Sequence, residues 1–328
     1  MEIFRSLDDI PVGLGKTVVT IGNFDGIHLG HRAIFRRVRR AAAAIHGVSV
    51  VITFVPHPLK VIPNPKKQIC LINTYAEKEN LISASGIDYL LAIPFTKEFA
   101  GLSAREFVTD VLVKRLGVSR LIIGYDYSFG RDREGTVAML AEMGRELGFA
   151  VEVLEPIGHD GEPYSSTQVR KMIKAGEVAG VVPLLGRQYS LSGIVVSGHH
   201  RGSGLGFPTA NIRTEKELIP KSGVYAVKVK LDNTLYDGAC NIGANPTFGN
   251  EEISIEVFLF DFTGDLYGRE LRFYFIARIR DERRFPDPEA LRLAIAGDVA
   301  RCREILSSTE LIEYHEYLQE EADGIVQG

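Results

Sequence analysis

The sequence has few cysteines and no long apolar run. Its three cysteines, Cys70, Cys240 and Cys302, lie far apart and form no Cys-x-x-Cys pair. This odd, scattered set excludes a disulfide framework and a thiolate-rich zinc site of ordinary spacing. No apolar stretch approaches the roughly 20 residues that a membrane-spanning helix needs. The first residues, MEIFRSLDD, carry acids and lack the apolar core of a signal peptide. We therefore expect a reduced, cytoplasmic protein with no membrane partner.

An excess of positive charge is also absent. The chain has 38 Lys and Arg against 42 Asp and Glu, a formal net charge of -4. Nonspecific nucleic-acid binding depends on a basic face that neutralises phosphates, so we expect no nucleic-acid partner. Hydrophobic residues make up 45% of the 328 residues, which is enough to fill two cores. The length itself favours two domains.

The first half alternates apolar runs with helical stretches. The predicted strands are 16–22, 48–54, 87–95, 119–127 and 149–157. The predicted helices are 31–46, 74–85, 103–116 and 135–147, and Ser103 and Glu106 have the spacing of a capping box. This alternation predicts an α/β domain with a parallel sheet covered on both faces. Ligands of such sheets lie beyond the carboxyl ends of the strands, where Gly22, Pro56 and Gly124 fall.

The second half changes pattern near Gly186, where we place the domain boundary (1–185 and 186–310, with a tail at 311–328). Helical character at 166–175 and 177–185 gives way to the predicted strands 189–196, 223–230, 234–242, 252–260 and 270–278. In ISIEVFLF, Ile253, Ile255, Val257 and Leu259 share one face and Glu256 lies on the other. The pattern predicts an antiparallel sandwich or barrel. A final helix begins at Asp287-Pro288.

Two histidines, His28 and His31, lie three residues apart between a predicted strand and a predicted helix. They could cap the turn, bind a metal or hold a phosphate. Gly30 between them lets backbone and phosphate approach closely, and a helix amino terminus favours an anion. Zinc is disfavoured because no third ligand lies nearby. The segment therefore favours a phosphate site, in which the imidazoles donate hydrogen bonds to oxygens that gain negative charge.

These residues carry a family resemblance. GNFDGIHLGHR is similar to the HxGH segment of the nucleotidyltransferase superfamily, and in particular to the bacterial bifunctional riboflavin kinase/FAD synthetases. Further blocks that resemble this family follow in order: FVPHP (54–58), IIGYDYSFG (122–130), SSTQVR (165–170), LGFPTANI (205–212), GVYAV (223–227), NIGANPTFG (241–249), IEVFLFDF (255–262) and LYGRELRFYFIARIRDERRF (266–285). The resemblance implies a Rossmann-like nucleotidyltransferase domain followed by an antiparallel β-barrel riboflavin kinase domain with a terminal helix.

In its first domain the family transfers AMP from ATP to FMN and releases pyrophosphate. The resemblance implies that His28 and His31 are catalytic and hold the ATP phosphates. The full ATP-binding set it implies is Gly22, Asn23, Asp25, His28, Gly30, His31, Ser165, Ser166, Thr167 and Arg170. The flavin side it implies is Phe54, His57, Pro58, Asp126 and Phe129. Without the resemblance, SST is an ordinary helix cap, and Phe54 suits a core position.

In its second domain the family transfers the γ-phosphoryl group of ATP to riboflavin, which makes FMN. The resemblance implies that Thr209 and Asn211 coordinate Mg²⁺ and that Glu256 is the catalytic general base. The nucleotide loop it implies is Gly202, Gly204, Gly206, Pro208, Thr209 and Asn211. Taken alone, these segments also suit a proline-led turn and a solvated strand carboxylate.

The chain departs from the family at two places. Ser203 stands where many relatives carry a basic residue, and Tyr127 replaces a common Phe. One alternative is another HxGH enzyme, such as an aminoacyl-tRNA synthetase, but the lysine loop and basic face that it needs are absent. The other is a flavin-binding regulator that retains only one activity. We expect ATP, riboflavin and FMN as small-molecule partners, and a monomer or weak homo-oligomer.

Overall fold

The computed structural model describes residues 1–328 except 12, 63–68, 160–161, 198–205, 248–249 and 314–328. It contains two compact units, Met1–Ser166 and Thr167–Gly328. The boundary that we predict between 185 and 186 lies later in the chain than this division. The helices α7 (Ser166–Ala175) and α8 (Val182–Leu185) account for the difference, because nearly all of their residues belong to the second unit.

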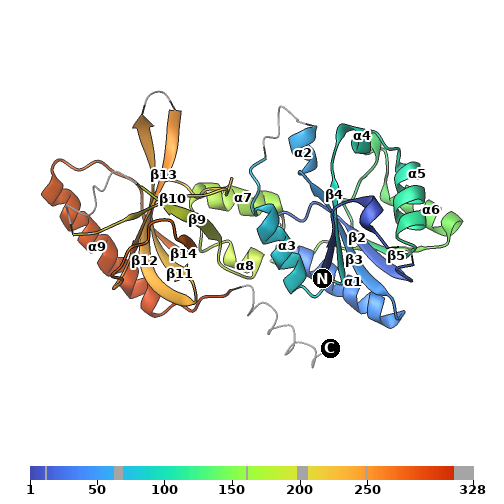
Figure 1. Cartoon of the computed structure of the whole chain (residues 1–328), viewed down its shortest axis with the longest axis horizontal. Helices are drawn as coiled ribbons and strands as arrows, with labels where there is room; N and C mark the ends of the chain where they lie inside the picture. The colour runs from blue at the N-terminus through green and yellow to red at the C-terminus, as the bar shows by residue number, and fades with distance from the viewer. Residues whose placement is uncertain (12, 63–68, 160–161, 198–205, 248–249, 314–328) are drawn as a thin grey trace. The chain divides into compact units, whose positions relative to one another are not determined.

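A six-stranded sheet forms the centre of the first unit (Figure 1), and its order across the sheet is β1-β4-β3-β2-β5-β6. The strands are β1 Glu2–Phe4, β2 Thr17–Ile21, β3 Val48–Val55, β4 Tyr89–Pro94, β5 Val118–Gly124 and β6 Ala150–Leu154. Every neighbouring pair is parallel, as predicted. The chain builds β3 and β4 on one side of β2 and then crosses to β5 on the other. Sheets of this kind bind ligands beyond the carboxyl ends of the strands at such a reversal, which here is at β2 and its neighbours.

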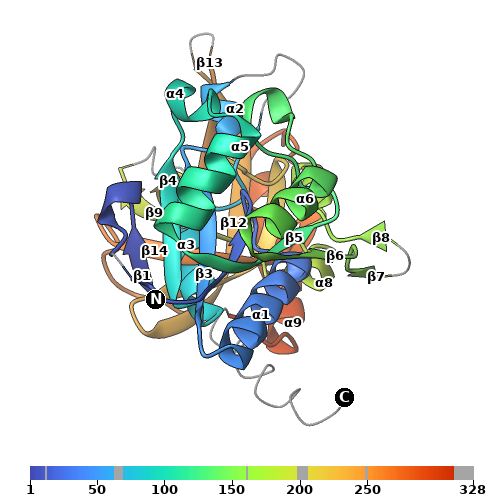
Figure 2. The ribbon, with the colours of Figure 1, turned by 90° about the vertical axis from the view of Figure 1, so that its right-hand side faces the viewer.

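Helices cover both faces of this sheet (Figure 2). They are η1 Leu7–Asp9, α1 Leu29–Ala44, α2 Pro58–Val61, α3 Tyr75–Ala84, α4 Lys97–Ala100, α5 Ala104–Glu106, η2 Phe107–Arg115, η3 Arg131–Arg133 and α6 Val137–Leu147. Val19 and Ile21 of β2 pack with apolar side chains of η2 and α6. Strand alternation turns Val18 and Thr20 to the opposite face, where α1 packs on β2. The capping box of Ser103 and Glu106 is confirmed. A short hairpin, β7 Gly158–His159 and β8 Glu162–Pro163, precedes α7.

The second unit is a closed antiparallel barrel with the order β10-β13-β12-β11-β14-β9. Its strands are β9 Ser190–Val196, β10 Ala210–Arg213, β11 Gly223–Leu231, β12 Thr234–Thr247, β13 Asn250–Leu259 and β14 Glu270–Arg280. The barrel closes because β9 pairs with both β10 and β14. This decides between the sandwich and the barrel that the strand pattern leaves open. Four-residue β10 is too short for its alternation to be recognised in the sequence.

One helix covers part of the outer barrel wall. Helix α9 (Pro288–Ser307) begins as predicted, with the Asp287 carboxylate accepting a hydrogen bond of 2.8 Å from the Ala290 amide. Its Cys302 and Leu306 pack on Ala226, Phe260 and Ile276. The helix therefore shields the apolar outer positions of neighbouring strands.

The register of β13 is regular along its pairing with β12, so Ile253, Ile255, Val257 and Leu259 alternate with Ser254 and Glu256. Ile255, Val257 and Leu259 are buried inside the barrel, whereas Ile253 is 57% exposed. Ile253 is exposed because it pairs with Ala244 toward the outer end of the β12–β13 hairpin, which extends beyond the barrel wall (Figure 1). The alternation of residues along a strand does not show which part of the strand extends beyond the core of the barrel.

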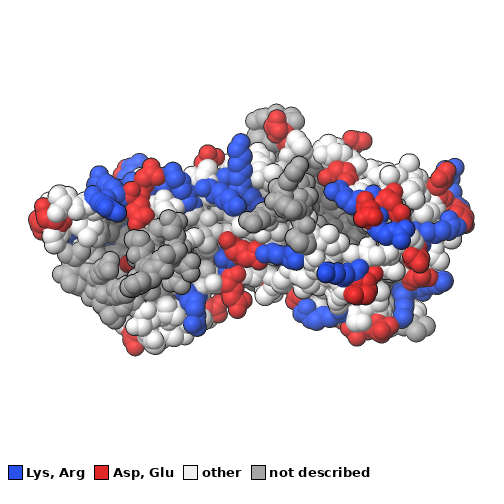
Figure 3. Space-filling model, turned by 90° about the horizontal axis from the view of Figure 1, so that it is seen from above, with Lys and Arg blue, Asp and Glu red and all other residues white. Residues whose placement is uncertain are grey.

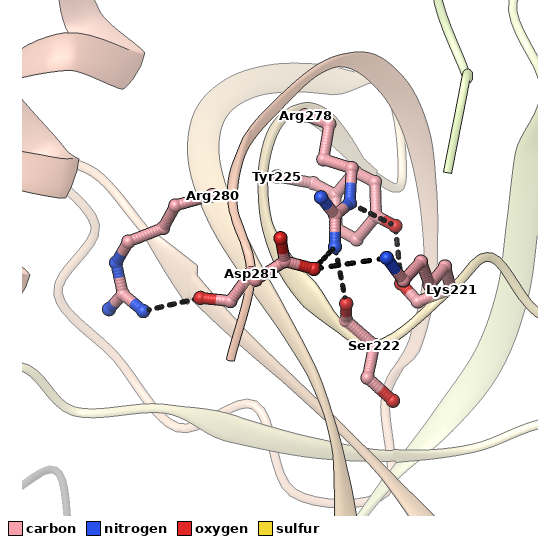
Figure 4. Close-up of polar contacts among 6 residues, drawn as sticks. All are labelled: Lys221, Ser222, Tyr225, Arg278, Arg280 and Asp281. Carbon is pink, nitrogen blue, oxygen red and sulfur yellow. Dashed lines mark hydrogen bonds and ion pairs between the residues drawn. The ribbon is translucent and has the colours of Figure 1, made fainter. Parts of the chain in front are cut away.

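A polar cluster joins the start of β11 to the end of β14 (Figure 4). Arg278 donates through Nη2 to the Ser222 carbonyl and to Asp281 Oδ1, both at 2.7 Å, and through Nε to the Tyr225 hydroxyl at 3.3 Å. The Tyr225 hydroxyl donates in turn to the Lys221 carbonyl. Asp281 also pairs with Lys221 Nζ at 3.2 Å. The cluster therefore satisfies the polar groups where these two strands meet.

Charges of both signs are interspersed on the surface. Figure 3 shows Lys and Arg side chains next to Asp and Glu side chains over one face of the described residues. Charged side chains of the described residues also form ion pairs, such as Arg303 with Asp261 at 2.8 Å and Arg280 with Asp298 at 2.7 Å. In the parts of the chain that the structure describes, no helix combines the length and hydropathy of a membrane span.

Candidate active sites

The loop between β2 and α1 begins where the sheet ends. The Gly22 amide donates a hydrogen bond to the Ile52 carbonyl of β3 at 3.0 Å, so the first residue of the loop is still paired with β3. Phe24 and Ile27 have φ angles of 45° and 41°, in the left-handed region that residues with a Cβ rarely adopt. The Asp25 carboxylate accepts hydrogen bonds from the Ile72 amide at 3.0 and 3.1 Å. These contacts hold a strained backbone in one conformation.

The two histidines lie together at the amino terminus of α1. Their ring centroids are 3.7 Å apart with an interplanar angle of 22°, and the Phe24 ring meets His31 edge-on at 5.2 Å. A Cβ on Gly30 would lie 3.1 Å from Nδ1 of His28, so glycine lets the ring lie against the helix. His28 is the residue before the helix, but its ring stacks on His31 and does not cap the turn. The structure therefore argues against the alternative of a capped turn, because His28 makes no side-chain cap hydrogen bond and is 6% exposed.

Burial governs the charge state of His31. Burial, then the positive charges of His28 and Lys78, hold the pKa of His31 well below its usual value of 6.5. His31 is therefore neutral at physiological pH and donates from an uncharged ring. Within the described residues, no group of three or more His, Cys, Asp or Glu side chains could hold a metal ion.

The second predicted ATP segment meets the same loop. Ser166, the first residue of α7, donates its hydroxyl hydrogen to the Asp25 carbonyl at 2.8 Å. Ser165 precedes it, and Thr167 and Arg170 follow on α7. Two segments that are 141 residues apart in the chain thus come together, as the resemblance implies.

Lys78 belongs to this region, and the sequence analysis missed it. It lies on α3, is 6% exposed, and donates through Nζ to the Asn23 carbonyl at 3.2 Å and to Thr53 Oγ1 at 3.1 Å. Burial lowers the pKa of Lys78 to about 8, although the negative charges of Asp25 and Glu79 oppose this shift. A lysine in the helical sequence YAEKENL has the pattern of a solvated charge, so the sequence holds no signal for its burial.

A row of aromatic rings connects the two predicted flavin segments. The distance between ring centroids is 5.8 Å from Phe54 to Phe99, 6.1 Å from Phe99 to Phe107, and 5.9 Å from Phe107 to Phe129. Tyr127 stacks on Phe129 at 5.6 Å. Phe54 packs against the core, but its ring is only partly buried, so part of it remains accessible. Phe99 and Phe107 join segments that the sequence motifs leave separate.

The other predicted flavin residues lie near the ends of β3 and β5. His57 is 5% exposed, accepts from the Leu59 amide through Nδ1 at 3.1 Å, and starts α2 with Pro58 as the next residue. Its own amide donates to the Tyr75 hydroxyl at 3.0 Å. Asp126 is exposed just after β5. His57 therefore shapes the turn after β3, whereas Asp126 faces solvent.

On the barrel, Thr209 donates its hydroxyl hydrogen to Glu256 Oε2 at 3.1 Å. Asn211 of β10 and Asn241 of β12 are the direct cross-strand partners of Glu256, one on each side. Direct partners in antiparallel strands share one face, and both neighbours of Glu256, Ile255 and Val257, point into the barrel. The three polar side chains therefore form a row on the outer wall. Asn241 is the member that the sequence analysis did not single out.

The predicted nucleotide loop is described only in part. Gly206 has a φ of 86°, which favours glycine, and Pro208 is exposed before Thr209. Gly202, Ser203 and Gly204 lie outside the described residues.

Comparison with known proteins identifies the family. Residues 12–168 match the FAD synthetase family and residues 185–306 match the riboflavin kinase family. A bifunctional riboflavin kinase/FMN adenylyltransferase from Pseudomonas fluorescens is 38% identical over 304 residues, which is 92% of this chain and 97% of the relative. Another, from Escherichia coli (strain K12), is 37% identical over 89% of this chain and 94% of its own length. The chain belongs to this family.

As a bifunctional riboflavin kinase/FMN adenylyltransferase, the chain combines an FAD synthetase domain with a riboflavin kinase domain. Riboflavin, FMN, FAD and ATP are the substrates and products of its two reactions. A solved structure of a macrolide-efflux protein from Streptococcus pneumoniae is 31% identical, has a TM-score of 0.83, and covers 92% of this chain and 98% of its own. The match to both family models decides against the two alternative functions, and the predicted α/β plus barrel fold is confirmed.

Proposed function

We propose that FMN adenylyl transfer takes place at the loop that carries His28 and His31. The observation that carries this proposal is the stacked histidine pair at the amino terminus of α1, with Ser166 bonded to the same loop. An FMN phosphate oxygen attacks the α-phosphorus of ATP, a new P–O bond forms, and the bond to pyrophosphate breaks. The histidines, the amides of α1 and the hydroxyl and guanidinium groups of 165–170 stabilise the charge on the phosphate oxygens. In this proposal Gly22, Asn23, Asp25 and Gly30 shape the loop.

FMN enters this site from the side of Phe54 and Phe129. Aromatic faces stack well on a flat ring system, and Phe54 and Phe99 are only partly buried, whereas Phe107 and Phe129 support them from the core. His57 and Pro58 form the turn after β3, and Asp126 lies after β5. These segments follow β3 and β5, the strands on either side of β2, at the edge where α/β sheets bind ligands.

Riboflavin phosphorylation takes place at the outer wall of the barrel in this proposal. The hydrogen bond from Thr209 orients the Glu256 carboxylate. Glu256 takes the proton of the ribityl 5'-hydroxyl as that oxygen forms a bond to the γ-phosphorus of ATP, and the bond from the γ-phosphorus to ADP breaks. We assign Gly202, Gly204, Gly206 and Pro208, which precede Thr209 in the sequence, to ATP binding.

The residues around Glu256 fit a magnesium ion. Thr209 and Asn211 offer a hydroxyl and an amide oxygen, and Asn211 shares the face of Glu256. Hard oxygen donors are the ligands that Mg²⁺ prefers, and it needs few of them when substrate phosphates and water supply the rest. Bound there, Mg²⁺ would neutralise phosphate charge.

One assay with matched variants tests both placements. The purified chain is given riboflavin, ATP and Mg²⁺, and its flavins are separated by chromatography. His28→Ala should stop FAD formation and leave FMN formation, and Glu256→Ala should stop FMN formation but leave FAD formation from added FMN. Loss of both activities in either variant contradicts two independent sites.

The remaining proposals concern the setting of these reactions. We place the enzyme in the cytoplasm as a monomer or weak homo-oligomer that acts on small molecules and not on nucleic acid. The net charge of -4 and the mixed charge on the face in Figure 3 support only the absence of nucleic-acid binding. We also retain 185/186 as the functional boundary, which agrees with the riboflavin kinase match that begins at 185.

A further inference from the structure

A buried lysine holds the loop that carries the two histidines. Lys78 Nζ donates to the Asn23 carbonyl at 3.2 Å and to Thr53 Oγ1 at 3.1 Å. The Thr53 hydroxyl donates to the same Asn23 carbonyl at 3.2 Å. Groups from α3, from β3 and from the loop therefore meet at one carbonyl oxygen.

This anchor lies next to the strained part of the loop. Phe24 follows Asn23 directly and has a φ of 45°. A left-handed conformation at such a residue persists only where neighbouring groups hold it. On the far side of Phe24, the Asp25 carboxylate is held by the amides of Ile72 and Asn73. The strained residue is thus fixed between two anchors, and its ring contacts His31.

Charge also links Lys78 to the site. Burial lowers the pKa of Lys78 to about 8, and the carboxylates of Asp25 and Glu79 act in the opposite direction. The charge of Lys78 in turn lowers the pKa of His31. Charged and titratable groups from several elements surround Lys78. They are Asp25 on the loop, His31 on α1, Tyr75 and Glu79 on α3, His57 after β3, and Arg5, which pairs with Glu79.

We propose that Lys78 is a positioning residue for adenylyl transfer, which holds the Asn23 carbonyl so that the loop presents His28 and His31 to the ATP phosphates. This inference rests on the proposed placement of the reaction at these histidines. Because Lys78 bonds the loop backbone, its loss should lower kcat for FAD formation more than it raises KM for FMN. The riboflavin kinase activity of the barrel should not change.

The test uses the full chain and measures FAD formation from added FMN across a pH series. In the native enzyme, kcat should fall as the pH rises through about 8, where Lys78 loses its proton. Lys78→Met should lower kcat by about 100-fold, the cost of a small misplacement of reacting groups, and should remove this alkaline fall. Lys97→Met, at an exposed lysine of α4, is the matched control and should behave as native.

A second variant keeps the fold and tests the same contact. Thr53→Val removes an oxygen that favours the charged form of Lys78, so the alkaline fall of kcat should move to lower pH. An unmoved profile in Thr53→Val, or a native kcat in Lys78→Met, overturns the proposal. So does a joint loss of FMN formation and thermal stability in Lys78→Met, which indicates a folding role. If His28→Ala retains FAD formation, the placement of the reaction fails instead.

Discussion

The imidazole rings of His28 and His31 are stacked with their centroids 3.7 Å apart at the start of α1. Two charged rings at this distance would repel each other, and burial further disfavours protonation of His31. His31 therefore contributes an uncharged hydrogen-bond donor, and the positive potential at the site comes from the helix terminus and nearby cations. The first two predictions concern this pair.

Replacing His28 should separate the two activities. His28→Ala removes a donor to the phosphate oxygens, and we expect kcat for FAD formation to fall by about 100-fold or more, as for other single donors to a transition state. FMN formation from riboflavin should be unchanged. His46→Asn is the matched control, because His46 is exposed and asparagine tolerates its φ of 51°. Chromatography of the flavins measures both products, and native FAD formation in His28→Ala would contradict the proposed site.

Stability should fall in mild acid because of His31. The unfolded chain binds a proton at His31 near pH 6.5, whereas the lowered pKa keeps the folded ring neutral. The unfolded state then binds more protons below that pH, so the free energy of unfolding should decrease by up to about 1.4 kcal/mol per pH unit. Urea unfolding at neutral pH and at lower pH measures this slope. His31→Gln should reduce it, whereas His46→Asn should not; equal slopes in all three proteins would exclude His31 as the cause.

The carboxylate of Glu256 should be essential on the barrel. Glu256→Gln keeps an oxygen that can accept from Thr209 but removes the base, so FMN formation should fall by about 100-fold or more. FAD formation from added FMN should remain native. Glu270→Gln, at an exposed glutamate that begins β14, is the control. A glutamine variant with native FMN formation would show that another group accepts the proton.

The Tyr225 hydroxyl should contribute to barrel stability. Burial raises the pKa of Tyr225, so its hydroxyl keeps the proton that it donates to the Lys221 carbonyl. Tyr225→Phe leaves that carbonyl and Arg278 Nε with one partner fewer, at a cost of about 1–2 kcal/mol in unfolding free energy. Tyr267→Phe, at a tyrosine that is 63% exposed, should change little. Denaturant unfolding compares the two variants, and equal midpoints would contradict this role.

Much of the fold follows from patterns of local period. The longer parallel strands are predicted because each is a short apolar run. The long strands of the barrel are predicted because apolar and polar residues alternate along them. β1 and β10 are missed because three or four residues are too few to show alternation. The exposure of Ile253 does not follow from the alternation, because it depends on how far the barrel extends behind that residue.

The candidate site divides in the same way. Motifs in which residue type and spacing both matter, such as those of His28, His31, Thr209 and Asn211, are recognisable in the sequence. Lys78 and Asn241 are not, because the features that bring them to the sites are the burial of one helix face and the register of two strands. Both features depend on contacts between residues that are far apart in the sequence, and no local pattern predicts such contacts.

Closure of the barrel limits which changes β13 can accept. Since β13 is paired along both edges, a one-residue insertion before Glu256 would have to be absorbed as a bulge or would reverse the two faces of the strand. Reversal would turn the carboxylate into the apolar interior and Val257 outward. The number of residues between the hairpin and Glu256 is therefore constrained by geometry, in addition to the side chains that the barrel core and the proposed site require.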